Sequence, residues 1–259
     1  MDGSIMGIFL KDINLKGKTA LITGATKGIG RATAVAIAQV GGNIIAVGRN
    51  QLELNSLEKL IKKSKVKYTA FNCDVNNYNS MKLFISKLKK IDVFVNNAGT
   101  NIPEPFLKVK KSSLETLLNV NTKSVFNLAQ LCANQMIKVN KKGGSIINTS
   151  SIFGLVAGQN RSVYSMTKFG VEGLTKGMAI DLARFNIRVN SVCPNIVLTP
   201  RTKKYLDNKE YKKYVKASTP LDKIATATDI ATAITFLASN AASMITGSSI
   251  VIDGGWTAI

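Results

Sequence analysis

TALITGATKGIG, residues Thr19–Gly30, is the stretch of sequence that decides the fold. Its first five residues are apolar or β-branched and predict a buried strand, and a helical pattern from Ile29 to Val40 follows directly. The glycines between them allow a tight turn, and the start of the helix offers free N–H groups to an anion. A purely structural turn is the alternative. The order of strand, glycine-rich turn and helix favours a site for the pyrophosphate of a dinucleotide.

The rest of the chain repeats this alternation of short β-branched runs and longer helical patterns up to the C-terminus. Such alternation predicts one α/β domain, in which a parallel sheet is covered by helices on both faces. We expect strands at residues 19–23, 43–47, 67–72, 91–95, 145–148, 187–192 and 249–252. We expect helices at 29–40, 52–63, 80–89, 112–139, 163–185 and 229–238. The domain should span 15–259 after an N-terminal extension at 1–14, and the lysine-rich insertion 199–219 is the natural substrate lid.

Composition narrows the possible function classes. Hydrophobic residues make up 45% of the 259, no apolar run is long enough to span a membrane, and no signal-peptide pattern is present. We therefore expect a soluble cytoplasmic protein. The net charge is +20, but the excess is mostly lysine spread over predicted helix faces and connections. Neither nucleic acid nor membrane is the expected partner, whereas a small anionic ligand is compatible with this surface.

Histidine is absent from the sequence. Its absence excludes Ser-His-Asp and Cys-His nucleophiles and histidine-ligated metals, so proton transfer must fall to Tyr, Lys, Asp or Glu. The cysteines Cys73, Cys132 and Cys193 lie about sixty residues apart, without the close spacing of metal or redox motifs. We expect free structural thiols in a reducing compartment and no metal site.

Ligands of open parallel sheets bind outside the carboxyl ends of the strands. Residues suited to binding or chemistry follow six of the predicted strands: Gly24, Arg49, Asp74, Asn96–Gly99, Ser151 and Pro194-Asn195. One functional site at this edge of the sheet is therefore expected.

Tyr164 and Lys168 form the candidate proton-transfer pair. On a helix they lie one turn apart, which places an ammonium beside a phenol and lowers the pKa of that phenol from about 10. Ser151, thirteen residues before Tyr164, would hold a substrate oxygen. The same spacing occurs at Tyr78/Lys82 and Tyr205/Lys209. Only the Tyr164 pair follows a predicted strand end together with Ser151, so it is the predicted site.

The end of the second strand predicts which dinucleotide binds. NAD sites usually carry an acid there for the ribose hydroxyl, but this strand ends in Gly48-Arg49 and no acid occurs before Glu53. Lys27 adds a cation inside the turn. Two cations suit a 2′-phosphate, which an arginine binds in a planar, charge-assisted way. NADP(H) is the predicted cofactor, and a solvated arginine with a surface lysine is the alternative.

From about Leu15 to Ile259 the sequence resembles the short-chain dehydrogenase/reductase family, including NADPH-dependent ketoacyl and carbonyl reductases and sugar dehydrogenases. The motifs are Thr23–Gly30, Asp74-Val75, Asn96–Gly99, Asn119–Thr122, Ser151, Tyr164 with Lys168, Arg188–Pro194, Ile245–Gly247 and Asp253–Gly255. The resemblance implies a Rossmann-type, doubly wound parallel sheet of about seven strands. It also implies a homotetramer, or failing that a dimer.

The resemblance further implies roles for individual residues. Tyr164 would exchange a proton with the substrate oxygen, Ser151 would orient that oxygen, Lys168 would lower the Tyr164 pKa and hold the nicotinamide ribose, and Asn121 would support a water chain behind Lys168. Asp74 would face the adenine, and the Pro194–Val197 backbone with Thr199 would hold the carboxamide. The implied cofactor-binding set is Gly24, Thr26, Lys27, Gly28, Ile29, Gly30, Arg49, Asp74, Val75, Asn97, Ala98, Gly99, Tyr164, Lys168, Pro194, Ile196, Val197 and Thr199.

One departure from the family pattern concerns Asn195, which stands where relatives commonly have glycine, so its backbone should avoid glycine-only conformations.

An NADPH-dependent carbonyl reductase is the first functional interpretation. A sugar or polyol dehydrogenase acting oxidatively is the second, and a non-catalytic NADP-binding protein is the third. Arg161 and the basic lid suggest an anionic substrate, with general lysine richness as the alternative.

Overall fold

The computed structural model describes residues 13–140 and 143–258, so most of the expected N-terminal extension, residues 1–12, lies outside the described residues. A seven-stranded parallel sheet in the order β3-β2-β1-β4-β5-β6-β9 forms the centre of the molecule. Its strands are β1 (Thr19–Thr23), β2 (Asn43–Gly48), β3 (Tyr68–Asn72), β4 (Val93–Asn96), β5 (Gly144–Thr149), β6 (Ile187–Pro194) and β9 (Ser249–Ile252). All seven expected strands are confirmed, each within two residues of its expected bounds.

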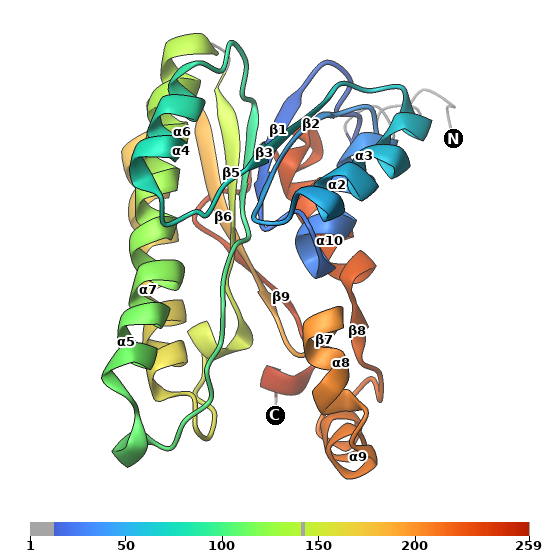
Figure 1. The fold of residues 1–259 in the computed structure, drawn as a ribbon, viewed down its shortest axis with the longest axis vertical. Coiled ribbons are helices and arrows are strands. Elements are labelled where there is room, and N and C mark those ends of the chain that lie inside the picture. Colours follow the sequence, from blue (N-terminus) through green and yellow to red (C-terminus); the bar gives the residue numbers. More distant parts are fainter. Residues whose placement is uncertain (1–12, 141–142, 259) are drawn as a thin grey trace.

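Helices cover both faces of the sheet (Figure 1). One face carries α2 (Gly28–Gln39), α3 (Gln51–Ile61) and α10 (Ala227–Ala238), and the other carries α4 (Tyr78–Ser86), α6 (Ser124–Val139) and α7 (Ser162–Ala183). Neighbouring β1 residues enter opposite cores, Ile22 the first and Leu21 the second, because successive strand side chains alternate. Strand order reverses at β1, between β2 and β4, and such a switch point is where ligands bind in this class of sheet.

The expected helix at 112–139 is interrupted. α5 (Lys111–Leu118) passes into the π-helical turn η3 (Asn119–Lys123) before α6 begins. The side-chain amide of the buried Asn121 exchanges hydrogen bonds with the backbone of Thr100, at 2.8 and 2.9 Å, which anchors this turn to the loop after β4. Turns of this kind are frequent at functional sites.

The lysine-rich insertion folds into α8 (Pro200–Leu206) and α9 (Lys209–Ala217). Thr199 caps α8 through a reciprocal pair of bonds with Thr202, and Asn208 caps α9. A separate two-stranded sheet, β7 (Val197–Leu198) with β8 (Ala225–Thr226), joins its two ends. These helices lie beyond the carboxyl ends of the central strands (Figure 1).

Short 3-10 turns complete the fold: η1 (Lys62–Ser64), η2 (Phe106–Lys108), η4 (Ile152–Gly154), η5 (Asn240–Ala242) and η6 (Trp256–Ala258). Within the described ranges, no helix combines the length and apolar character that crossing a membrane requires.

Candidate active site

The Thr23 hydroxyl ties together the two strand ends at the switch point. It accepts hydrogen bonds from the backbone amides of Asn97, at 2.9 Å, and Ala98, at 3.0 Å. The Asn97 side-chain amide donates in return to the Thr23 carbonyl at 2.9 Å. The glycine-rich turn after β1 and the loop after β4 therefore form one connected unit.

Glycine is required inside this turn. Gly24 and Gly28 have φ of +65° and +55°, in the left-handed region that most side chains avoid. A Cβ on Gly30 would lie 2.4 Å from the Gly24 carbonyl oxygen and 2.5 Å from Asn97 Nδ2. A Cβ on Gly28 would lie 3.1 Å from the methyl group of Thr199. The turn and the start of the lid form a close-fitting backbone cradle at a helix N-terminus, which suits a pyrophosphate.

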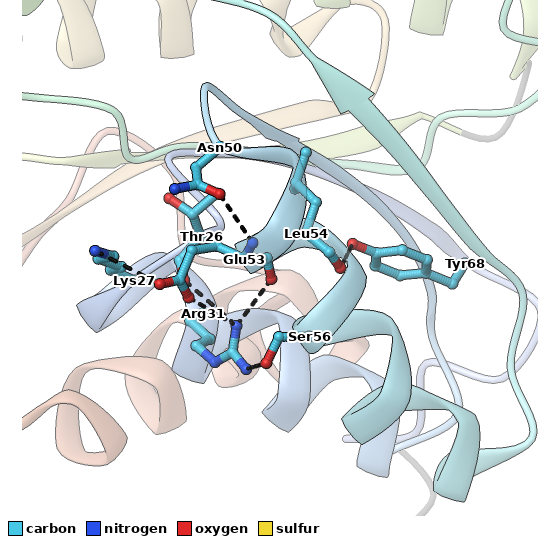
Figure 2. Close-up of polar contacts among 8 residues, drawn as sticks. All are labelled: Thr26, Lys27, Arg31, Asn50, Glu53, Leu54, Ser56 and Tyr68. Carbon is cyan, nitrogen blue, oxygen red and sulfur yellow. Dashed lines mark hydrogen bonds and ion pairs between the residues drawn. The ribbon is translucent and has the colours of Figure 1, made fainter.

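The cations expected to bind a 2′-phosphate both have acidic partners. Figure 2 shows Glu53, in the first turn of α3, between Lys27 and Arg31. The Glu53 carboxylate lies 3.5 Å from Lys27 Nζ and 3.8 Å from Arg31 Nη1. Arg49 lies 3.4 Å from the Asp74 carboxylate, and its side chain is 78% exposed. Because exposed pairs contribute little free energy, a phosphate can compete for both cations.

Several other expected cofactor residues pack on the two cores or lie at the ends of strands. A Cβ on Gly48, at the end of β2, would lie 2.4 Å from the Thr26 methyl group. Ile29 packs on the core of the first face and Val75 on that of the second. Pro194 and Val197 are buried, and Ile196 is partly exposed.

The four expected catalytic side chains gather near Gly99, in the loop after β4 that the Thr23 hydroxyl holds. A Cβ built on Gly99 would lie 3.5 Å from Asn121 Oδ1 and 3.8 Å from Lys168 Nζ. Lys168 Nζ donates to the Thr149 carbonyl at 2.8 Å and lies 5.7 Å from the centre of the Tyr164 ring. Ser151 is hydrogen-bonded to Tyr164.

The pKa of Tyr164 differs from the sequence-based expectation. Burial raises it, and the groups that act against burial are the Ser151 hydrogen bond, Arg201 and Arg161. The expected net lowering of the Tyr164 pKa is therefore wrong for this arrangement, because burial outweighs the groups that act against it. The phenol keeps its proton near neutrality, which suits a proton donor.

Lys168 has a lowered pKa. It is lowered from 10.5 to about 8, chiefly by burial; Cys193 and Glu172 raise it, and Arg201 lowers it. Glu172 lies one turn beyond Lys168 on α7 and is buried. Its carboxylate accepts hydrogen bonds from the hydroxyls of Ser191, at 2.9 Å, and Ser249, and from the Cys193 thiol at 3.4 Å. Glu172 is thus a fixed, hydrogen-bonded anion behind the Lys168 ammonium.

Comparisons with known proteins agree with this arrangement. The family model described as enoyl-(acyl carrier protein) reductase matches residues 24–257. The 3-oxoacyl-(acyl-carrier-protein) reductase FabG of Thermotoga maritima is 36% identical over 247 residues, covering 94% of this chain and 99% of its own. This chain belongs to the short-chain dehydrogenase/reductase family. It is accordingly an oxidoreductase of the kind that acts on carbonyl and alcohol groups.

Solved structures of this family share the fold and differ in cofactor. A gluconate 5-dehydrogenase from Burkholderia cenocepacia in complex with NADP and tartrate superposes with a TM-score of 0.91 at 30% identity, covering 96% of this chain and 99% of its own. A carveol dehydrogenase from Mycobacterium avium in complex with NAD has a TM-score of 0.90 at 26% identity, covering 95% and 99%. Family membership therefore leaves the choice between NADP and NAD to the chain's own residues.

The structure also identifies residues that sequence reasoning missed. The Thr23 hydroxyl and the Thr149 carbonyl each fix a site residue, and both lie at the end of a strand. Glu172 had a sequence signal, since it continues the four-residue spacing of Tyr164 and Lys168. The prediction for Asn195 is confirmed, because it has no positive φ. Among the described residues, no group of three or more Cys, Asp or Glu side chains could hold a metal.

Replacing Gly30 with Ala should disrupt the cradle, because the added methyl group would collide with the Gly24 carbonyl. We expect the dissociation constant for NADPH, from fluorescence titration, to rise at least about tenfold, with a lower melting temperature. The control is Lys59→Ala on the exposed side of α3, which should leave NADPH binding unchanged. Unchanged NADPH binding in Gly30→Ala would contradict the assignment of this turn.

The Glu172→Gln variant tests the buried anion behind Lys168. Without that charge the Lys168 pKa should fall below about 8. In a profile of kcat/KM against pH, activity falls on the alkaline side as Lys168 loses its proton. This alkaline limb should then move to lower pH. Ser249→Ala removes one hydrogen bond but keeps the carboxylate, so its alkaline limb should stay in place. Equal shifts in both variants would point to a packing effect instead.

Proposed function

We propose that this protein is an NADP(H)-dependent reductase that converts a carbonyl compound into a secondary alcohol. The observation that carries the proposal is the gathering of Asn121, Ser151, Tyr164 and Lys168 beside Gly99, next to the glycine-rich turn. Family membership supports the reaction class. In the second interpretation the same four residues would catalyse an oxidation. The direction of the reaction is therefore inferred from the cofactor and from the protonation state of Tyr164.

A bound nicotinamide dinucleotide supplies the hydride in such a reaction. Tyr164 then donates its phenolic proton to the carbonyl oxygen, which Ser151 positions by a hydrogen bond. The positive charges of Lys168, Arg161 and Arg201 stabilise the phenolate that remains. A phenol whose pKa burial has raised is protonated before reaction, which favours the reductive direction. Positioned proton transfer of this kind contributes about 10²- to 10⁴-fold.

Arg49 and Lys27 support NADP(H) as the cofactor. Both side chains are more than half exposed, at 78% and 58%, and each carries only a solvent-exposed ion pair. A 2′-phosphate dianion would offer Arg49 charge-assisted, planar hydrogen bonds that the Asp74 pair does not surpass. In this arrangement Asp74 holds Arg49 near the end of β2 until the cofactor binds.

A sugar or polyol dehydrogenase is the second candidate. The resemblance to a gluconate 5-dehydrogenase favours it, since gluconate is a polyhydroxy acid. A non-catalytic NADP-binding protein, the third interpretation, would not depend on the Tyr164 hydroxyl.

We also propose a cytoplasmic location and assembly into a homotetramer, or failing that a dimer. Cys73, Cys132 and Cys193 are free thiols, which suits a reducing compartment.

The outer side of α7 supports the proposed assembly. It exposes Met166, Phe169 and Ile180 beside glycines with open space around them, a surface on which another helix could pack. Light scattering of the purified protein measures the assembly, and a monomer would refute it.

Tyr164→Phe should nearly abolish turnover while leaving the cofactor site intact. We expect kcat for NADPH-dependent ketone reduction to fall about 10²- to 10⁴-fold, since the proton donor is removed, with an unchanged dissociation constant for NADPH. The control is Tyr205→Phe, which removes the exposed hydroxyl of a tyrosine with the same spacing to a lysine and should leave turnover unchanged. Full activity in Tyr164→Phe would overturn the proposal.

Arg49→Asp should move the cofactor preference toward NADH. Losing a charge-assisted contact to the 2′-phosphate and adding a repulsive carboxylate should weaken NADPH binding by about ten- to a hundredfold, with little loss of NADH binding. Lys59→Asp makes the same charge change on the exposed side of α3 and should not alter the ratio. Unchanged NADPH affinity in Arg49→Asp would exclude this residue from the cofactor site.

A further inference from the structure

Arg201, on lid helix α8, reaches back to the catalytic groups. Its Nη1 donates to the Gly99 carbonyl at 3.0 Å, across 102 residues of sequence. Gly99 is the residue against which Asn121 and Lys168 lie. Arg201, an exposed residue of the lid helix, therefore reaches the loop against which Asn121 and Lys168 lie.

Arg161 lies close to Tyr164 in the sequence. It precedes the first residue of α7, and its carbonyl accepts the Ser165 amide at 2.7 Å, so it lies one turn before Tyr164. Its Nε is buried and has no hydrogen-bond partner, and its Nη1 reaches only the neighbouring Asn160 carbonyl at 3.3 Å. A buried donor without a partner is costly unless a ligand satisfies it.

Neither guanidinium is neutralised by the protein. Within the described ranges, no carboxylate lies within 4.0 Å of Arg161 or Arg201. Glu104, which lines a small hollow with Arg161, is bonded to the Ser113 hydroxyl and the Lys110 amide, both at 3.1 Å. Glu172 is bonded to the hydroxyls behind Lys168. Two unpaired guanidiniums therefore act on Tyr164.

Two aromatic side chains extend from Tyr164. The Phe153 ring packs edge-on against Tyr164, with centroids 6.3 Å apart, and against Trp256, at 6.2 Å. Asp253 fixes the Trp256 segment by accepting the Gly255 and Thr257 amides, both at 2.8 Å. Phe153 and Trp256 thus offer an apolar surface next to Tyr164, on whose pKa the guanidinium groups of Arg161 and Arg201 also act.

We propose that Arg161 and Arg201 form an anion-binding site, and that the substrate carries a carboxylate close to its reacting carbonyl or alcohol carbon. This inference rests on the proposed function. An arginine binds a carboxylate through two parallel hydrogen bonds, which are stronger than a bond to a neutral carbonyl. The substrate anion would therefore replace the Gly99 carbonyl at Arg201 and give Arg161 Nε its missing partner. Its apolar part would lie on Phe153 and Trp256.

The test compares charged and neutral substrates of the same shape. A series of short oxo acids of increasing chain length, each paired with its methyl ester, is assayed with saturating NADPH. The wild type should prefer the best acid over its ester by about tenfold or more in kcat/KM. Arg201→Met and Arg161→Met should each remove most of that preference, read as the acid-to-ester ratio, because a weaker stabilisation of the phenolate lowers the reduction of acid and ester alike. Equal losses on acid and ester, or no acid preference in the wild type, would overturn the inference.

The matched control is Lys203→Met, which removes one positive charge from the same lid helix. It should leave the acid-to-ester ratio unchanged. A loss as large as that of Arg201→Met would show that the general charge of the lid attracts acids, and would refute a specific site.

A binding measurement separates this inference from the proposed function. Malonate, an unreactive dicarboxylate, is titrated into the protein with and without NADP by calorimetry. Malonate binding that weakens about tenfold in either arginine variant supports the anion site even if no oxo acid is reduced, in which case only the proposed reaction fails. Absent binding, or binding that the arginine variants leave unchanged, overturns the anion site, and ester reduction with NADPH would then leave the reductase proposal standing.

Discussion

The Thr23 hydroxyl makes the connection on which the candidate site depends. Two parallel strands that end side by side do not by themselves fix the loops that follow them. By accepting both the Asn97 and Ala98 amides, this hydroxyl locks the loop after β4 onto the glycine-rich turn. Gly30 can then pack against the Gly24 carbonyl without a side chain between them, and Gly99 lies where Asn121 and Lys168 converge. The cofactor cradle and the catalytic groups are both held by Thr23 at the end of β1. Their separation therefore depends on how β1 and β4 lie in the sheet.

Burial and charge oppose each other within the catalytic group. Burial alone disfavours both the Lys168 ammonium and a Tyr164 phenolate. A lysine pKa lowered from 10.5 to about 8 corresponds to roughly 3 kcal/mol against the charged form. Glu172 reduces the cost of burying the Lys168 ammonium. Arg161 and Arg201 reduce the separate cost of burying a Tyr164 phenolate. The arrangement holds a protonated phenol and a lysine that titrates near the operating pH, which are the two states a reductive proton transfer needs.

The sequence predicted the features that depend on local periodicity and on strand ends. The seven strands are present, and Tyr164 lies with Ser151 beside Lys168, whereas Tyr78 begins the surface helix α4 and Tyr205 lies in the lid. The missed features depend on contacts between distant residues. The Lys27–Glu53 pair requires the start of α3 to lie beside the turn, and the Arg201–Gly99 bond joins residues 102 apart. The π turn at Asn121 was missed because one extra residue in a helical turn barely alters the apolar pattern.

Helix α8 gives the lid a physical connection to both halves of the site. Its cap residue Thr199 lies against the cradle, where a Cβ on Gly28 would lie 3.1 Å from its methyl group, and Arg201, two residues later, is bonded to Gly99. A helix of one or two turns moves as a unit, so a cofactor that shifts Thr199 also shifts Arg201. If a substrate anion takes Arg201 from the Gly99 carbonyl, the exchange favours the anion because a carboxylate carries a full negative charge and can accept two parallel hydrogen bonds, whereas the carbonyl is neutral. Cofactor binding at one end of α8 and substrate binding at the other are therefore expected to depend on each other, and the size of that coupling is limited by the difference between these two Arg201 contacts.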